Sequence, residues 1–119
     1  MKRNLTTFLR QHQAFKLQHQ DAIKKLATQG QSPQAMVVSC CDSRVDPALI
    51  FGAQPGDIFV SRVIANIIPS YLESLRQDNS VSAAMEYAIC HLQVSHLIIL
   101  GHSQCGGVQA MINQAEGLT

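Results

Sequence analysis

The stretch "QAMVVSCCDSR", residues 34–44, decides the fold, because it passes from apolar, strand-forming residues directly into reactive side chains. A second apolar run, "GDIFVSRVIA" at 56–65, overlaps the turn signal "AQPG". A third run, residues 97–100 within "HLIILGHSQCGG", is continuously apolar, which is typical of a strand buried on both faces. The sequence therefore predicts three short strands.

Helical patterns surround these strands. Residues 4 to about 29 carry apolar side chains at helical spacing with a polar reverse face, and Gly30 ends the pattern. Residues 81–92 form a second helical pattern, and the glycines after the third strand open a last helix over 107–117. Residues 67–80 are predicted to be a connection. Strands that alternate with helices favour an α/β fold, a parallel β-sheet core flanked by helices, here with a long N-terminal helix.

The overall composition limits the class of partner. The chain of 119 residues suits a single domain, 1–119, with an N-terminal helical arm at about 1–30 and an α/β core at about 31–119. A formal net charge of +1 provides no polybasic face for nucleic acid or anionic lipid. No apolar run approaches the roughly 20 residues that cross a bilayer. We therefore expect a small-molecule substrate, no nucleic acid or membrane partner, and a cytoplasmic location.

The chain contains four cysteines and no recognisable export signal. Because the cytosol keeps thiols reduced, a disulfide framework is not expected, which leaves metal binding, catalysis or simple burial. Cys90 lies within the helical pattern at 81–92 and is predicted to be a core residue, since a free cysteine behaves as a small apolar side chain.

Two motifs are predicted to converge on one edge of the sheet. "CCDSR" (40–44) follows the first strand and "GHSQCGG" (101–107) follows the third, and ligands of parallel sheets bind beyond the carboxyl ends of the strands. Together the motifs offer Cys40 or Cys41 with His102 and Cys105. Zinc accepts two thiolates and one imidazole, and three protein ligands leave a fourth position for water, as in catalytic sites.

Two neighbouring charged residues fit the same chemistry. Asp42 lies two residues after Cys40, so it points to the same side if the strand continues, and it can accept a hydrogen bond from water at the fourth position. Arg44 can hold Asp42 ionised, and away from the metal, through a bidentate pair. Zinc lowers the pKa of a bound water to about 7, so the pattern indicates hydration or hydrolysis.

The motifs at 40–44 and 101–107 resemble the paired signature of the β-class carbonic anhydrases, and the resemblance runs from residue 31 to 108. It implies one zinc ion per subunit, with three residues as ligands: Cys40, His102 and Cys105. It implies further that Asp42 and Arg44 control access to the fourth position. Cys41 stands where the family usually has serine.

The resemblance is to the plant-type branch and extends to a substrate pocket. It implies that Gln31 binds bicarbonate or orients CO2 and that Phe59 and Tyr87 wall the pocket. His91 lies where relatives are suspected of shuttling protons, although a simple helix histidine is the preferred interpretation. Val63 departs from the family pattern, which has asparagine at this position.

The resemblance also carries expectations about the whole molecule. Relatives continue past the point matched by Thr119 with another strand and helices, so the C-terminal part of the family fold is expected to be absent from residues 1–119. A homodimer or higher homo-oligomer is expected, with residues 4–29 packed on a second chain.

Three functions follow from these patterns. The first is a zinc lyase that interconverts CO2 and bicarbonate. The second is a zinc-binding but catalytically impaired remnant or interaction module. The third is a hydrolase in which Cys40 is a nucleophile paired with His102, and only this function predicts activity without metal.

Overall fold

The structure, a computed structural model, describes residues 2–117 and divides into two compact units, Met1–Gln31 and Ser32–Thr119. The N-terminal unit consists of helices α1 (Leu5–Gln18) and α2 (Gln20–Gln29). None of the helices in the described part of the chain is both long and apolar enough to cross a membrane.

The helical structure predicted for residues 4–29 is confirmed, but it is divided at one residue. Asn4 caps α1, because its side chain accepts a hydrogen bond from the Thr7 N–H at 3.0 Å. His19 leaves helical geometry (φ −107°, ψ 16°), although its N–H still donates to the Phe15 carbonyl, so the helix changes course without losing this bond. Gly30 ends α2 with φ at 80°, as predicted.

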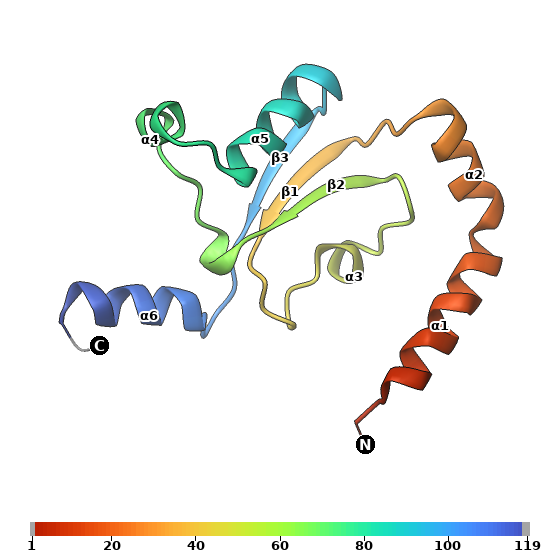
Figure 1. The fold of residues 1–119 in the computed structure, drawn as a ribbon, viewed down its shortest axis with the longest axis horizontal. Coiled ribbons are helices and arrows are strands. Elements are labelled where there is room, and N and C mark those ends of the chain that lie inside the picture. Colours follow the sequence, from red (N-terminus) through yellow and green to blue (C-terminus); the bar gives the residue numbers. More distant parts are fainter. Residues whose placement is uncertain (1, 118–119) are drawn as a thin grey trace. The chain divides into compact units, whose positions relative to one another are not determined.

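The second unit is built on a three-stranded parallel sheet (Figure 1). Its strands are β1 (Ala35–Ser39), β2 (Ile58–Arg62) and β3 (His96–Leu100), in the order β2-β1-β3. In the register, Ser39 lies beside both Arg62 and Leu100, so all three strands end at the same level. The α/β fold with a parallel sheet is therefore confirmed, and the segments that follow β1 and β3 start from one edge.

The strands differ in burial because of their order. All five residues of the central strand β1 are buried, and Met36 and Val38 form the core with Val81 and Ala88. The expectation that the third strand is buried on both faces is wrong, since Leu97 is 41% exposed. Among the described residues only β1 pairs with β3, so β3 lies at an edge of the sheet. Its apolar composition alone was therefore not sufficient to predict its position in the sheet.

The helix predicted over 81–92 is confirmed, although its second half is a π-helical turn. A short helix also forms inside the segment predicted to be a connection, and Ser70 and Glu73 close its first turn with a reciprocal capping box. The remaining elements are α3 (Pro47–Phe51), η1 (Ile64–Asn66), α4 (Tyr71–Arg76), α5 (Ser80–Glu86), η2 (Tyr87–His91) and α6 (Gly106–Ala115).

The prediction that Cys90 belongs to the core is wrong, because its thiol is exposed. Within the turn η2, Ala88 is the residue that faces the core. Cys90 lies two residues further on, where the turn faces a surface cavity that Tyr71 and Met85 also line. The helical pattern identified the element but not which side of the turn the sheet covers.

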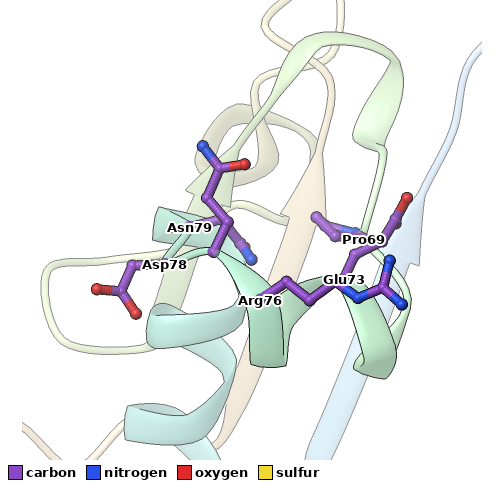
Figure 2. A pocket seen from close by; sticks show the side chains of 6 residues that line it. Pro69, Glu73, Arg76, Asp78 and Asn79 are labelled. Carbon is purple, nitrogen blue, oxygen red and sulfur yellow. The ribbon is translucent and has the colours of Figure 1, made fainter.

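The connection between α4 and α5 borders a surface pocket of about 480 Å3 (Figure 2). Its labelled lining residues are Pro69, Glu73, Arg76, Asp78 and Asn79. The Glu73 carboxylate accepts a hydrogen bond from the Ser70 N–H, and the Asn79 side chain accepts one from the Ser82 N–H. These two polar groups cap helices instead of converging on a ligand.

Candidate metal centre

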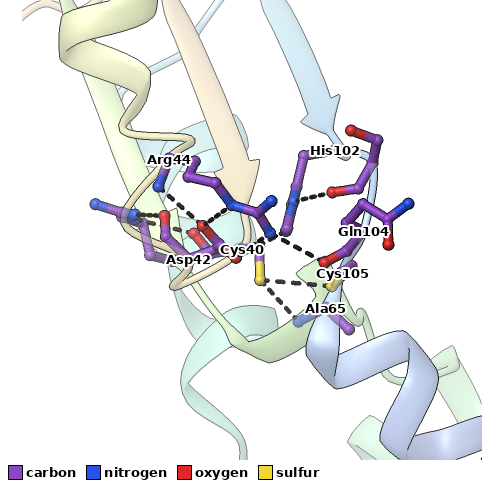
Figure 3. A network of polar contacts seen from close by, with 9 residues as sticks. Cys40, Asp42, Arg44, Ala65, His102, Gln104 and Cys105 are labelled. Atoms are coloured by element: carbon purple, nitrogen blue, oxygen red, sulfur yellow. Dashed lines mark hydrogen bonds and ion pairs between the residues drawn. The ribbon is translucent and has the colours of Figure 1, made fainter.

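Three potential metal ligands meet at the carboxyl edge of the sheet. Cys40 directly follows β1, whereas His102 follows β3 and Cys105 is the N-cap residue of α6. Their ligand atoms all lie within 4.8 Å of one another (Figure 3). The predicted convergence of the two motifs is therefore present in the structure, and it follows from the common level at which the parallel strands end.

The two sulfur atoms have the spacing of a tetrahedral zinc site. Cys40 Sγ and Cys105 Sγ are 3.8 Å apart. With a zinc–sulfur distance of about 2.3 Å, tetrahedral geometry separates two sulfurs by about 3.8 Å. The positions of the two thiols thus fit the ion without rearrangement.

The imidazole of His102 is oriented so that Nε2 can act as the third ligand. Nδ1 lies 2.9 Å from the Ser103 carbonyl oxygen, so Nδ1–H donates to this oxygen and Nε2 keeps its lone pair. Nε2 is buried and has no hydrogen-bond partner. A buried polar atom without a partner is costly. A cation bound by Nε2 together with the two sulfur atoms would provide the missing partner.

Asp42 and Arg44 form the predicted bidentate pair. Arg44 Nε lies 2.9 Å from Asp42 Oδ1, and Arg44 Nη2 lies 2.8 Å from Oδ2. These bonds, and the Arg44 backbone N–H, hold the pKa of the Asp42 carboxyl well below its usual range. Asp42 Oδ2 is 3.9 Å from His102 Nε2, so an ionised acceptor lies beside the ligand cluster.

Arg44 also connects the two loops of the site. Its Nη2 donates to the Gln104 carbonyl at 3.0 Å, and Gln104 presents this carbonyl from a left-handed conformation with φ at 55°. One guanidinium therefore ties the loop after β1 to the loop after β3.

Arg62 is a site residue that the sequence interpretation missed. Its Nε donates to the Cys40 carbonyl at 3.0 Å, its Nη2 donates to the Asp42 carbonyl at 2.7 Å, and Nη1 pairs with Asp46 at 3.2 Å. It thus fixes the backbone of the loop that carries Cys40. The available signal was the presence of a charged arginine inside the largely apolar second run at 56–65.

The structure separates the two adjacent cysteines. Cys40 is buried in the cluster, whereas Cys41 is exposed and outside it. The pKa of the Cys40 thiol is lowered to about 6, principally by the nearby His102 ring and next by the Asp42 backbone. Burial has the opposite, smaller effect. The pKa of His102 is raised, mainly by the same interaction with Cys40. Cys40 is therefore predisposed to the thiolate form that metals bind.

The predicted pocket residues are only partly brought together. The rings of Phe59 and Tyr87 lie 5.8 Å apart, and His91 stacks on Tyr87 at 5.3 Å. Phe59 pairs with Met36, four residues before Cys40, and four strand residues span about 13 Å. The two rings thus form a pair away from the ligand atoms of their own chain.

Two further sequence expectations concern Gln31 and Val63. Gln31 is an exposed residue at the end of the N-terminal unit, and its role in a pocket stays a prediction. Val63 packs its side chain against the core cluster, and its N–H donates to the Ser39 carbonyl at 2.8 Å. Valine at this position therefore serves the core.

A cavity of about 510 Å3 opens beside the ligand cluster, and its lining includes His102, Gln104 and Cys105. A small molecule can approach the imidazole and one of the thiols from this side. The fold and the cluster together define an α/β protein whose three potential ligands have the arrangement of a catalytic metal centre, in which one coordination position is left open.

Comparison with known proteins names the family. Residues 35–119 match the carbonic anhydrase family. The chain is 37% identical over 103 residues to β-carbonic anhydrase 5, chloroplastic, of Arabidopsis thaliana, covering 85% of this chain and 33% of the relative. The chain belongs to the β-carbonic anhydrase family.

Solved structures show the same relationship. The crystal structure of a β-carbonic anhydrase of Aspergillus fumigatus is similar with a TM-score of 0.71 and 36% identity, over 91% of this chain and 49% of that one. A structure from work on two tetrameric β-carbonic anhydrases of Sordaria macrospora has a TM-score of 0.71 and 37% identity, over 91% and 51%. The chain spans about a third of the plant relative and about half of these solved chains.

Proposed function

We propose that this protein catalyses the reversible hydration of CO2 to bicarbonate and a proton, with one zinc ion per subunit held by Cys40, His102 and Cys105. The observation that carries the proposal is the cluster of three donor atoms within 4.8 Å, one of them a buried nitrogen without a partner. When bound, zinc lowers the pKa of a coordinated water to about 7, which supplies a nucleophile at neutral pH.

The residues of the chain have distinct roles in this proposal. The hydrogen bond from His102 Nδ1–H to the Ser103 carbonyl fixes the ring with Nε2 toward the two thiols. Asp42, kept ionised by Arg44, accepts a hydrogen bond from the reacting water and orients it. Arg44 also holds the Asp42 carboxylate back from the metal ligands, which keeps the fourth position open.

We further propose that Gln31, Phe59 and Tyr87 form the substrate pocket, in which Gln31 contacts bicarbonate or CO2 and the two rings provide an apolar wall. Because Phe59 lies about 13 Å along the sheet from Cys40, the two rings would serve the metal site of a second copy. The pocket would then exist only in the oligomer.

A homodimer or higher homo-oligomer is accordingly the proposed active form. Helix α4 exposes large apolar side chains, with Tyr71 75% exposed and Leu72 68% exposed, which favours association. The Sordaria relatives are described as tetrameric. We place the protein in the cytoplasm, since all four thiols are free and a reducing compartment preserves them; the plant relative is chloroplastic.

The central experiment measures zinc content and CO2 hydration on the same preparations. The wild-type protein should carry about one zinc per subunit, and Cys40→Ser should lose both zinc and activity. Cys41→Ser is the matched control and should retain both, because Cys41 is exposed and outside the cluster. Equal loss in the two variants would contradict the assignment of the ligands.

The alternative of a Cys40 nucleophile has one observation in its favour, the pKa of Cys40 lowered to about 6 by His102. Against it, Cys40 is only 4% exposed, and its sulfur lies 3.8 Å from a second thiol. Hydrolytic activity in protein stripped by a chelator would support this alternative. A zinc-loaded protein without CO2 hydration would support the impaired module instead.

A further inference from the structure

The short turn η1 has an unusual backbone. Ala65 and Asn66 have φ angles of 58° and 45°, in the left-handed region that residues other than glycine adopt at a cost. Val63, just before the turn, donates its N–H to the Ser39 carbonyl at 2.8 Å. The turn is thus anchored to the end of β1, next to the candidate metal centre.

The left-handed turn directs one backbone group at the metal centre. The Ala65 N–H donates to Cys40 Sγ at 3.3 Å (Figure 3). Ala65 is itself buried, so water does not compete for this N–H. An amide that donates to a ligating thiolate withdraws charge from the sulfur and fixes its direction, as do other groups that support metal ligands.

Helix α6 packs closely against the same turn through Gly107. A Cβ at Gly107 would lie 2.6 Å from Ile64 Cγ2, 3.1 Å from Ala65 Cβ and 3.3 Å from the Ala65 nitrogen. The neighbouring Gly106 would place a Cβ with nothing within 4 Å. Because α6 follows Cys105 directly, this close approach connects one thiol ligand with the donor to the other.

We propose that the Ala65 amide supports the metal centre as a hydrogen-bond donor to the Cys40 thiolate, and that Gly107 is a positioning residue whose missing side chain keeps this donor in place. The inference rests on the proposed metal site and adds residues to it that neither bind the metal nor touch substrate. It explains why the left-handed turn and the close glycine occur together.

The first test uses two glycine variants and Co2+ as a spectroscopic probe. Gly107→Ala should weaken Co2+ binding by about 10- to 100-fold, and should shift the thiolate-to-cobalt absorption bands. Gly106→Ala is the matched control and should leave affinity and spectrum unchanged. Both variants exchange glycine for alanine in the first turn of α6, so a difference between them reports the contact with η1.

A double variant tests the contact itself. Ile64→Ala removes the methyl group that would lie 2.6 Å from the new Cβ, so Gly107→Ala combined with Ile64→Ala should regain a large part of the lost affinity. Wild-type affinity and an unchanged cobalt spectrum in Gly107→Ala alone would overturn the role of Gly107.

A second test observes the hydrogen bond directly in the wild-type protein. In protein loaded with 113Cd, the Ala65 amide proton should show a scalar coupling to cadmium, transmitted through Cys40 Sγ. Cadmium bound by the wild type but without this coupling would overturn the hydrogen bond while leaving the metal site intact. Cadmium bound equally well by Cys40→Ser would contradict the metal site itself, and with it this inference.

Discussion

Adjacent residues of the same type have different environments at the end of β1. Cys40 directly follows the fully buried strand and is itself buried, whereas the chain turns after it and leaves the Cys41 thiol exposed. Arg62 holds this turn by binding the carbonyl oxygens of Cys40 and Asp42. The reactivity of Cys40 is therefore set by its contacts and not by its residue type.

The first prediction at this scale concerns the titration of Cys40 in metal-free protein. Its pKa is lowered from 9.0 to about 6, so thiolate absorbance should appear near pH 6 and should be absent in Cys40→Ser. Because its pKa in the folded state is the lower one, Cys40 by itself adds stability to the metal-free protein as the pH rises from about 6 to 9.0, and this contribution is lost as the pH falls back through about 6. The raised pKa of His102 acts in the opposite direction, because its contribution is lost as the pH rises above 6.5 through the raised value, so the net gain should appear mainly above the pKa of folded His102.

The cause of the shift is tested by His102→Ala. The His102 ring is the principal group that lowers the pKa of Cys40, so the midpoint of the thiolate titration should move upward in this variant. A midpoint that does not change would show that the backbone amides, and not the imidazole, stabilise the thiolate.

The second prediction concerns Asp42. Asp42→Asn removes the ionised acceptor, so kcat for CO2 hydration should fall by about 10²- to 10⁴-fold, whereas zinc content should stay near that of the wild type. Stopped-flow kinetics and elemental analysis on one preparation check both quantities. Asp78→Asn, the same change at an exposed position far along the chain, serves as control and should alter neither.

Arg44→Lys separates charge from geometry in the same pair. Lysine keeps the positive charge but cannot donate two parallel bonds to Asp42 and a third to the Gln104 carbonyl. Turnover should therefore fall although the net charge is unchanged. Full activity in Arg44→Lys would mean that a point charge is sufficient at this position.

At the scale of secondary-structure elements, the central strand β1 organises the core. Its five residues are all buried, and both neighbouring strands pair with it in parallel. β2 and β3 have comparable apolar sequences but lie at the edges, where their side chains are only half-buried or exposed. Apolar character predicted the strands correctly, but their burial follows from the order in the sheet.

The third prediction tests this difference in burial. Met36→Ala in β1 removes a side chain that is 0% exposed, and should lower the free energy of unfolding by about 2–5 kcal/mol. Leu49→Ala on α3, where the side chain is 81% exposed, should change it by less than about 0.5 kcal/mol. Denaturant titrations measure both values, and equal losses would contradict the assigned core.

For the whole molecule, association is the property on which the proposed function most depends. No residue of α1 or α2 is buried, although both helices carry large apolar side chains. Exposed apolar faces on a small protein favour contact with a second chain. The proposed pocket also requires a second copy, so the oligomer and the activity should be linked.

The fourth prediction concerns the oligomeric state and its dependence on the apolar face of α1. Sedimentation should find dimers or larger species at micromolar concentration, and the double variant Phe8→Glu, Leu9→Glu should shift the distribution toward monomers. Gln11→Glu introduces a charge at a polar position of the same helix and is the control. A monomeric wild-type protein with full CO2 hydration activity would contradict both the oligomer and the shared pocket.

The sequence by itself determined the parallel α/β fold, the convergence of 40–44 with 101–107, and the Asp42–Arg44 pair. These features follow from the order of short segments along the chain. Parallel strands end at one edge of the sheet, which brings the segments after them together, and two side chains that are two residues apart can pair without a distant partner. They were therefore accessible from spacing and residue type.

Only the tertiary structure decided which surfaces are covered and which distant groups meet. It placed Cys90 at the surface and β3 at an edge, and it brought Arg62 and the Ala65 amide to Cys40. Each of these depends on contacts between segments far apart in the chain, and the energy of such contacts is not expressed in the local pattern of apolar and polar residues. A backbone amide in a left-handed turn has no sequence signature at all, because every residue except proline carries the same N–H.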